Sequence, residues 1–160
     1  MKKITSLLIL LAIFASCSQN ISFNNPSVQG KKDGILWRAT ESHATRGAGT
    51  ALSIEASNAF ETLTLNTTLS SPGVFPLGTS ESKKATFITV VDGVTSDYET
   101  GYNYTTNTGI GDGQIQITEH DTVNMTVSGT FRFNAKKMNS TPGEETLNFY
   151  EGVFYKVPVR

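Results

Sequence analysis

The chain of 160 residues has 13 basic and 14 acidic residues and a net charge of −1, with no block of basic residues. Nucleic-acid binding therefore lacks an electrostatic basis, and no nucleic-acid partner is expected. The single cysteine excludes an intramolecular disulfide, but a chain of this length buries a full hydrophobic core without one. Threonine is the commonest residue, and β-branched and aromatic side chains are plentiful, which favours β-sheet.

The first residues have the layout of a signal peptide. Two lysines follow Met1, and the apolar run over residues 7–15 is too short to span a bilayer. This run leads into Ala15-Ser16-Cys17, which resembles the lipobox of bacterial lipoproteins. The resemblance implies that residues 1–16 are a lipoprotein signal peptide and that Cys17 is lipidated. A cut after Ser18, with soluble secretion, is the alternative.

The segment that follows the cysteine is polar. Residues 17–32 are therefore predicted to be the lipidated cysteine and a flexible tether, and residues 33–160 the folded domain. Alternation of apolar and polar residues then predicts strands, with Ile35, Trp37 and Ala39 on one inward face. In the first half of the domain the strands are expected over residues 34–39, 50–57, 61–69, 74–77 and 84–91.

The second half of the domain continues the same pattern. Asp92-Gly93 between β-forming residues predicts a hairpin turn, because both residues tolerate a positive φ. The most regular alternation covers residues 122–135 and places Val123 and Met125 on the inward face, with a bend or bulge at Gly129. The strands expected here are residues 96–106, 114–118, 122–135 and 147–157.

These elements predict an all-β fold. Many short strands separated by turn residues, with no amphipathic helix after the cysteine, are typical of antiparallel sandwiches and barrels. We therefore expect a single antiparallel β-sandwich or barrel domain after a lipoprotein signal peptide and a short tether.

Four segments carry a family resemblance. They are Gly34-Ile35-Leu36-Trp37-Arg38-Ala39, Pro72-Gly73-Val74-Phe75-Pro76-Leu77-Gly78, Ser128-Gly129-Thr130-Phe131-Arg132-Phe133 and Glu151-Gly152-Val153-Phe154-Tyr155-Lys156-Val157-Pro158. Together they resemble a family of small Gram-negative lipoproteins whose all-β domain has no assigned function. The resemblance covers nearly all of the chain after the signal peptide. It implies a cell-envelope lipoprotein and supplies no catalytic residue.

The chemistry-bearing residues do not assemble into a catalytic motif. His43 and His120 stand outside any cluster with the ligand spacing of a metal site, so no metal and no cofactor is expected. Glu119-His120-Asp121 is interpreted as a solvated turn between two strands, with a catalytic or metal-binding role as the alternative. A nucleophile elbow and a phosphate-binding loop are both missing from the sequence. The protein is therefore not expected to be an enzyme.

Two further features are candidate sites. Tyr98, Tyr102 and Tyr104 share one face of a predicted strand, where they form a candidate binding face or an ordinary half-buried sheet face. Asp121-Thr122-Val123 resembles a short bacterial O-glycosylation sequon. Thr122 is therefore a candidate glycosylation site, or else a threonine on the outer face of a strand.

The leading functional hypothesis is a membrane-anchored, non-catalytic binding or interaction module of the cell envelope. Its partners would be the membrane, through the lipid anchor, and a protein or glycan ligand. The outer membrane, facing the periplasm, is the expected location, with the cell surface as the alternative. A small-ligand-binding or inhibitor β-barrel and a cryptic hydrolase are the competing hypotheses.

Overall fold

The protein folds into a curled β-sheet. A computed structural model describes residues 27–69, 72–90, 101–138 and 146–160, and in these residues it contains no helix. The predicted all-β class is confirmed. The strands are β1 (Val28–Lys32), β2 (Ile35–Arg38), β3 (Glu41–Arg46), β4 (Ala51–Ser57), β5 (Glu61–Thr68), β6 (Gly73–Leu77), β7 (Lys84–Val90), β8 (Gly101–Thr105), β9 (Asp112–Asp121), β10 (Thr126–Lys137) and β11 (Thr146–Pro158).

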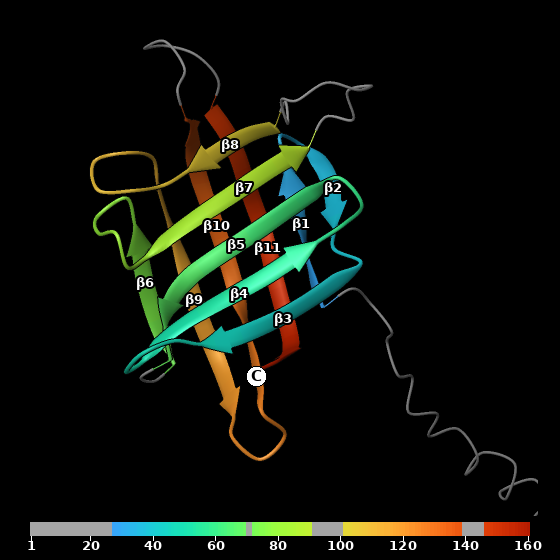
Figure 1. Ribbon diagram of the computed structural model, residues 1–160, viewed down its shortest axis with the longest axis vertical. Coiled ribbons are helices and arrows are strands. Elements are labelled where there is room, and N and C mark those ends of the chain that lie inside the picture. The colour runs from blue at the N-terminus through green and yellow to red at the C-terminus, as the bar shows by residue number, and fades with distance from the viewer. Residues whose placement is uncertain (1–26, 70–71, 91–100, 139–145) are drawn as a thin grey trace, which may run out of the picture.

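The sheet curls into two facing layers (Figure 1). Its strands follow the order β2-β1-β11-β10-β8-β7-β5-β4-β3. β9 also pairs with β10, and β6 pairs with the other edge of β9. β3, β4, β5 and β7 cross in front of β9, β10 and β11. A parallel bridge between Ala44 and Val159 brings β3 back to the end of β11. This curvature is consistent with the predicted sandwich or barrel.

Aromatic rings fill the space between the layers. Phe87, Phe133, Phe149 and Phe154 are all almost fully buried. Trp37 meets Phe87 and Phe149 edge-on, with ring centroids 5.9 and 5.6 Å apart. Such geometry is favourable for aromatic quadrupoles, and each buried ring contributes about 1.5–3 kcal/mol of hydrophobic stabilisation. The core is therefore a packed aromatic cluster that joins both layers.

Two bulges give β11 its curvature. Glu151 and Lys156 have φ angles of 51° and 48°, in the left-handed region. At each bulge the pairing with β10 shifts, so that two residues of β11 face one residue of β10. The bulge at Lys156 is held by a hydrogen bond from its N–H to Ser128 Oγ, 3.1 Å long. The predicted irregularities near Gly129 and Gly152 correspond to these bulges.

The start of the domain differs from the prediction. The last five residues of the expected tether, over residues 17–32, form strand β1 between β2 and β11. A two-residue Asp33-Gly34 turn with φ angles of 48° and 87° connects β1 to β2, as in a type I′ hairpin. The same Asp-Gly signal at residues 92–93 lies outside the described residues. The Asp33 N–H also donates to the Asn148 carbonyl, which attaches this turn to β11.

The predicted strand over residues 122–135 begins too early. β9 runs to Asp121, so Glu119-His120-Asp121 belongs to a strand and is not the turn that was expected. Residues 122–125 form the turn, and β10 starts at Thr126. Val123 is 88% exposed and Met125 is exposed, contrary to the prediction that both face inward. Asp121 explains the difference, because its Oδ1 accepts hydrogen bonds from the N–H groups of the two residues after Thr122, both 2.9 Å long.

Two other expectations were wrong. Ile35 shares the inner face of β2 with Trp37, as predicted, but it follows directly after the hairpin turn and is largely exposed. Strand β3 was not expected. Only Ala44 of its six residues is buried, so the strand lacks the repeated apolar side chains by which alternation is recognised.

Three phenylalanine rings lie against glycines of neighbouring strands. A Cβ at Gly30 would lie 2.6 Å from Cε1 of Phe149, and one at Gly152 would lie 2.6 Å from the Phe131 ring. Gly129 is opposite Phe154 in the same way. Neighbouring strands can therefore approach only because these positions have no side chain.

The contact between Gly30 and Phe149 is testable by a double-mutant cycle. We expect Gly30→Ala to lower the free energy of unfolding by about 1–3 kcal/mol, because the added methyl overpacks the core. Phe149→Leu alone also lowers the free energy of unfolding. The double variant should lose less than the sum of the two single losses, since the smaller leucine side chain leaves room for the methyl. Chemical denaturation of the four proteins measures this coupling.

Ile54 provides the matched control for this cycle. Its side chain is buried on β4, which pairs with β3 and β5 rather than with β1. The effects of Gly30→Ala and Ile54→Val should add to within about 0.5 kcal/mol. If Gly30→Ala showed the same coupling energy with Ile54→Val as with Phe149→Leu, a specific contact between the Phe149 ring and Gly30 would be contradicted.

Candidate functional site

The two histidines lie on different strands and do not share a site. His43 is on β3, and His120, near the end of β9, lies with Nε2 3.1 Å from Arg46 Nη2. Within the described part of the chain, no group of three or more His, Cys, Asp or Glu side chains could hold a metal ion. The position of His120 beside a guanidinium is unlike that of a general base, which is usually oriented by a carboxylate.

The tyrosine face is described only in part. Tyr98 lies outside the described residues, and of Tyr102 only the backbone is described, paired with Thr89. Tyr104 pairs with Phe87, is half-buried and packs against the hydrophobic core. This position favours the alternative that the face is an ordinary half-buried part of the sheet. A ligand-binding role of these tyrosines stays a prediction.

Thr122 is exposed in the turn between β9 and β10, and not on a strand face as the alternative supposed. Asp121 forms the base of this turn. Hydrogen bonds from the Asn124 backbone N–H and side chain, opposed in part by desolvation, hold the pKa of the Asp121 carboxyl below its ordinary value. Glycosylation of Thr122 stays a prediction that an exposed turn allows.

The anchor lies outside the described residues as well. Cys17 and the segment before it belong to this undescribed part. In the ranges that the structure does describe, there is no helix with the length and hydropathy needed to cross a membrane. Lipidation of Cys17 remains a prediction from the sequence.

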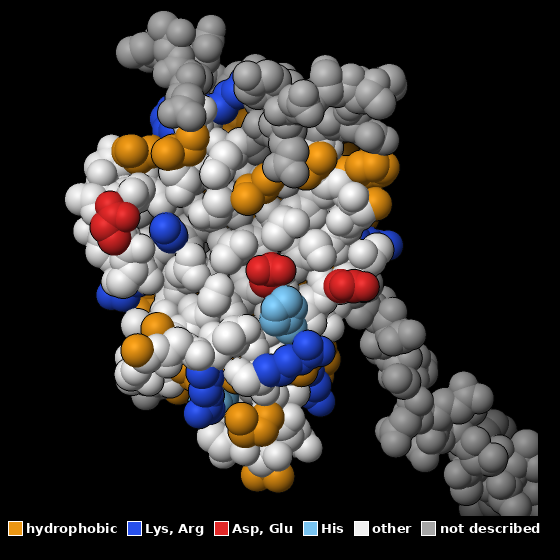
Figure 2. Space-filling model, viewed as in Figure 1, with side chains coloured by type: hydrophobic (Ala, Val, Ile, Leu, Met, Phe, Trp, Pro, Cys, Tyr) orange, Lys and Arg blue, Asp and Glu red, His pale blue; other side chains and the backbone are white. Residues whose placement is uncertain are grey.

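An exposed apolar patch lies at one end of the domain. We call it the apolar rim, and it consists of Ile35, Leu36, Phe60 and Val90, whose exposed fractions lie between 50 and 71%. A hydrogen bond joins two of its members, since the Val90 N–H donates to the Phe60 carbonyl over 2.8 Å. Figure 2 shows hydrophobic side chains along the upper margin of the domain, beside the grey residues.

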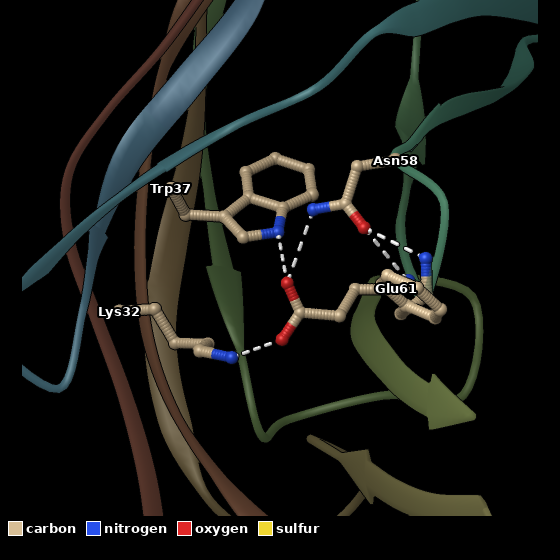
Figure 3. A network of polar contacts seen from close by, with 5 residues as sticks. Lys32, Trp37, Asn58 and Glu61 are labelled. Atoms are coloured by element: carbon tan, nitrogen blue, oxygen red, sulfur yellow. Dashed lines mark hydrogen bonds and ion pairs between the residues drawn. The ribbon is translucent and has the colours of Figure 1, made fainter. Parts of the chain in front are cut away.

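A polar network adjoins the rim at Phe60, and Figure 3 shows its members Lys32, Trp37, Asn58 and Glu61. Glu61 accepts hydrogen bonds from Trp37 Nε1 (2.8 Å) and Asn58 Nδ2 (3.1 Å) and forms an ion pair with Lys32. Asn58 Oδ1 in turn accepts the N–H groups of Phe60 and Glu61 at 3.0 and 2.9 Å. The network joins β1 and β2 to β5, and thereby fixes the backbone that carries the rim.

Electrostatics within the network favour the charged carboxylate. Burial alone would raise the pKa of Glu61, but hydrogen bonds from Lys32, Asn58 and Trp37 together with the Lys32 charge outweigh it, so the pKa is lowered. The Lys32 ammonium also lies 5.0 Å from the centre of the Phe87 ring. The network therefore stabilises the contact between the two layers, and its two charged residues, Lys32 and Glu61, are paired with each other.

Sequence reasoning missed both the rim and the network. Ile35 was assigned to the core by alternation, and Phe60 lies in the turn between β4 and β5, where no pattern distinguishes it. Glu61 is far from Lys32 in sequence, so no local spacing connects them. The one available signal was the presence of Ile35 and Leu36 directly after an Asp-Gly turn.

Glu61→Gln is expected to lower the free energy of unfolding at pH 7 by about 1–3 kcal/mol, because the ammonium of Lys32 loses its partner. A lowered carboxyl pKa contributes stability above the unfolded-state pKa of about 4.3, which is lost as the pH falls through the folded-state pKa. The difference in the free energy of unfolding between wild type and Glu61→Gln should therefore shrink below about pH 4.3. Urea denaturation at several pH values measures it.

Glu55→Gln is the matched control, since Glu55 is exposed on the outer face of β4. Its stability should stay within about 0.5 kcal/mol of the wild-type value. If the two variants behave alike at every pH, the network does not stabilise the fold.

Comparison with known proteins yields one match. A family model described as a domain of unknown function, DUF6252, matches residues 24–158. No curated protein and no solved structure matches the chain. The expected resemblance to a family of unassigned function is confirmed at this level. Because the match covers most of the chain, the protein belongs to the DUF6252 family.

Proposed function

We propose that this protein is a lipid-anchored, non-catalytic interaction module of the Gram-negative cell envelope, and that it binds a partner protein through the apolar rim. The exposure of Ile35, Leu36, Phe60 and Val90 is the observation that carries this proposal. Large exposed apolar patches mark interaction sites, whereas apolar residues exposed singly are common. Three of the four rim residues are aliphatic, which suits a protein better than a glycan, since glycans are recognised by aromatic faces and hydrogen-bonding groups.

The rim is also held in a fixed shape. Asn58 bonds the backbone of Phe60, and Lys32 pairs in register with Ile35 while it binds Glu61. A partner would therefore bind a preorganised surface and lose little free energy in ordering it. β2 is an edge strand of the sheet, so a partner segment in extended conformation could add main-chain hydrogen bonds there.

The competing hypotheses have less support. A small-ligand barrel needs an unfilled interior, whereas Phe87, Phe133, Phe149 and Phe154 occupy the space between the layers. A hydrolase would need an oriented base, and the described contact of His120 is with Arg46. The interaction module is the function that the geometry supports best.

The anchor part of the proposal depends on the sequence. Lysines at positions 2 and 3, an apolar run and Cys17 after Ala-Ser support export and lipidation. Each buried methylene contributes about 0.8 kcal/mol, so two or more acyl chains hold a protein stably on a bilayer. We propose the periplasmic face of the outer membrane as the location, with the cell surface as the alternative.

Cys17→Ala should remove the protein from the membrane fraction or leave an uncut precursor, because attachment depends on one thiol. Cell fractionation followed by immunoblotting measures both the location and the size of the product. Ser18→Ala is the control, since it keeps the cysteine and should leave membrane attachment unchanged. A processed Cys17→Ala variant that still sediments with membranes would contradict lipid anchoring.

A photo-reactive phenylalanine analogue tests the rim in living cells. Placed at position 36 or 60, it should yield a discrete cross-linked protein adduct. Phe60→Asp should remove the adduct formed from position 36 without changing the amount of protein, because a buried unpaired carboxylate is unfavourable at an interface.

Val74 is the matched control position for this experiment. It is an exposed aliphatic residue, 54% accessible, on β6, which is not part of the rim. No adduct is expected there. The same adduct from positions 60 and 74, or none from any rim position, would contradict a specific protein partner.

A further inference from the structure

A second exposed surface lies where the chain enters the domain. The Tyr155 N–H donates to the Ser27 carbonyl over 2.7 Å, so the last residue before β1 lies beside the end of β11. The Val159 N–H donates to the Met125 carbonyl over 2.8 Å, which brings the turn between β9 and β10 to the same place. Figure 1 shows this turn and the C-terminal end together at the bottom of the domain.

Apolar side chains project from this end. Val123 is 88% exposed at the tip of the turn, Met125 follows it, and Tyr155 is 58% exposed. None of these three side chains belongs to the hydrophobic core. Val123 is the most exposed large hydrophobic residue of the described chain.

Basic side chains surround them. The backbone of Arg160 bonds to Ala44 and Arg46, and Arg46 lies beside His120. The Lys156 ammonium lies 5.3 Å from the centre of the Tyr155 ring. We call Val123, Met125 and Tyr155, together with Arg46, His120, Lys156 and Arg160, the entry face.

Two acidic residues also lie near this face. Both oxygens of Asp121 are engaged within the turn, and the Lys156 charge acts on this carboxyl. Glu119 Oε2 accepts a hydrogen bond of 3.4 Å from Ser128 Oγ on the neighbouring strand. The two ion pairs of the described residues, Lys31 with Glu151 and Lys32 with Glu61, include neither Arg46 nor Arg160, and both arginines are exposed.

We propose that the entry face lies directly on a phospholipid bilayer. Val123 and Met125 would insert at the boundary between head groups and acyl chains, Tyr155 would lie at head-group depth, and the basic side chains would contact phosphates. This inference rests on the proposed anchor at Cys17. The segment between Cys17 and Val28 reaches at most about 40 Å when extended, so the anchor holds this end of the domain near the membrane.

The orientation has a consequence for the apolar rim. β1 begins at Val28, beside the entry face, and ends at Lys32, beneath the rim. β11 likewise runs from the neighbourhood of the Asp33 turn to the entry face. A domain that rests on its entry face therefore presents the rim away from the membrane, where a partner protein can reach it.

Fluorescence quenching tests this orientation on the full, lipidated chain. Once Cys17 is acylated, Val123→Cys provides a single free thiol for an environment-sensitive fluorophore. In vesicles of phosphatidylethanolamine and phosphatidylglycerol, its emission should shift to the blue and be quenched by lipids with brominated acyl chains. Phe60→Cys, labelled on the rim, is the matched control and should show neither effect.

Two further measurements separate the effect of the lipid anchor from a direct contact of the entry face with the bilayer. Flotation of the vesicles reports the anchor itself: loss of flotation overturns the proposed function and this inference with it. Flotation without quenching at position 123, or with equal quenching at position 60, overturns the inference alone. Met125→Asp should reduce the quenching at position 123, and unchanged quenching would show that the tether alone brings the label to the bilayer.

Discussion

The close approach of phenylalanine rings to glycines is the constraint on which the rest of the structure depends. Phe131, Phe149 and Phe154 lie against Gly152, Gly30 and Gly129, where any side chain would overlap the ring. The rings can then lie flat along the inner surface of β10 and β11 and contact one another, with centroids 5.3–6.5 Å apart. The bulges at Glu151 and Lys156 add the curvature that brings the front layer over them.

Because the interior of the domain is filled, the candidate binding sites lie on its surface. Because the rings occupy the space between the layers, the described domain offers its interactions through the ends of the barrel-like sheet and its outer faces. At one end, the contacts of Glu61 with Lys32 and Trp37 satisfy polar groups that the fold partly withdraws from water. Four large apolar side chains stay exposed beside it, and the proposed binding of a partner depends on them: Ile35, Leu36, Phe60 and Val90.

Alternation in the sequence predicted which face a residue occupies better than how deeply it is buried. The inward residues of β4 and of β10 after its start are buried as expected. Ile35 and Val123 belong to the same kind of pattern, but Ile35 lies beside a turn and Val123 lies within one. Both side chains are largely exposed. The network of Glu61 could not be predicted, since its partners come from β1, β2 and the turn before β5 and meet only through the curl of the sheet.

Exposed hydrophobic residues alone do not distinguish a protein partner from a membrane, but their charged neighbours do. At the apolar rim the two lysines that pair in register with Ile35 and Leu36 are each bound to a carboxylate, Lys32 to Glu61 and Lys31 to Glu151. The entry face combines a protruding valine with Arg46 and Arg160, and the chain leading to Cys17 joins the domain there. Apolar tips flanked by cations match the boundary of a phospholipid layer, where acyl chains and phosphates lie within a few ångströms of each other. The two ends of the sheet therefore differ in character, and with the proposed anchor at Cys17 the direction of β1 would place the entry face towards the membrane and the rim away from it.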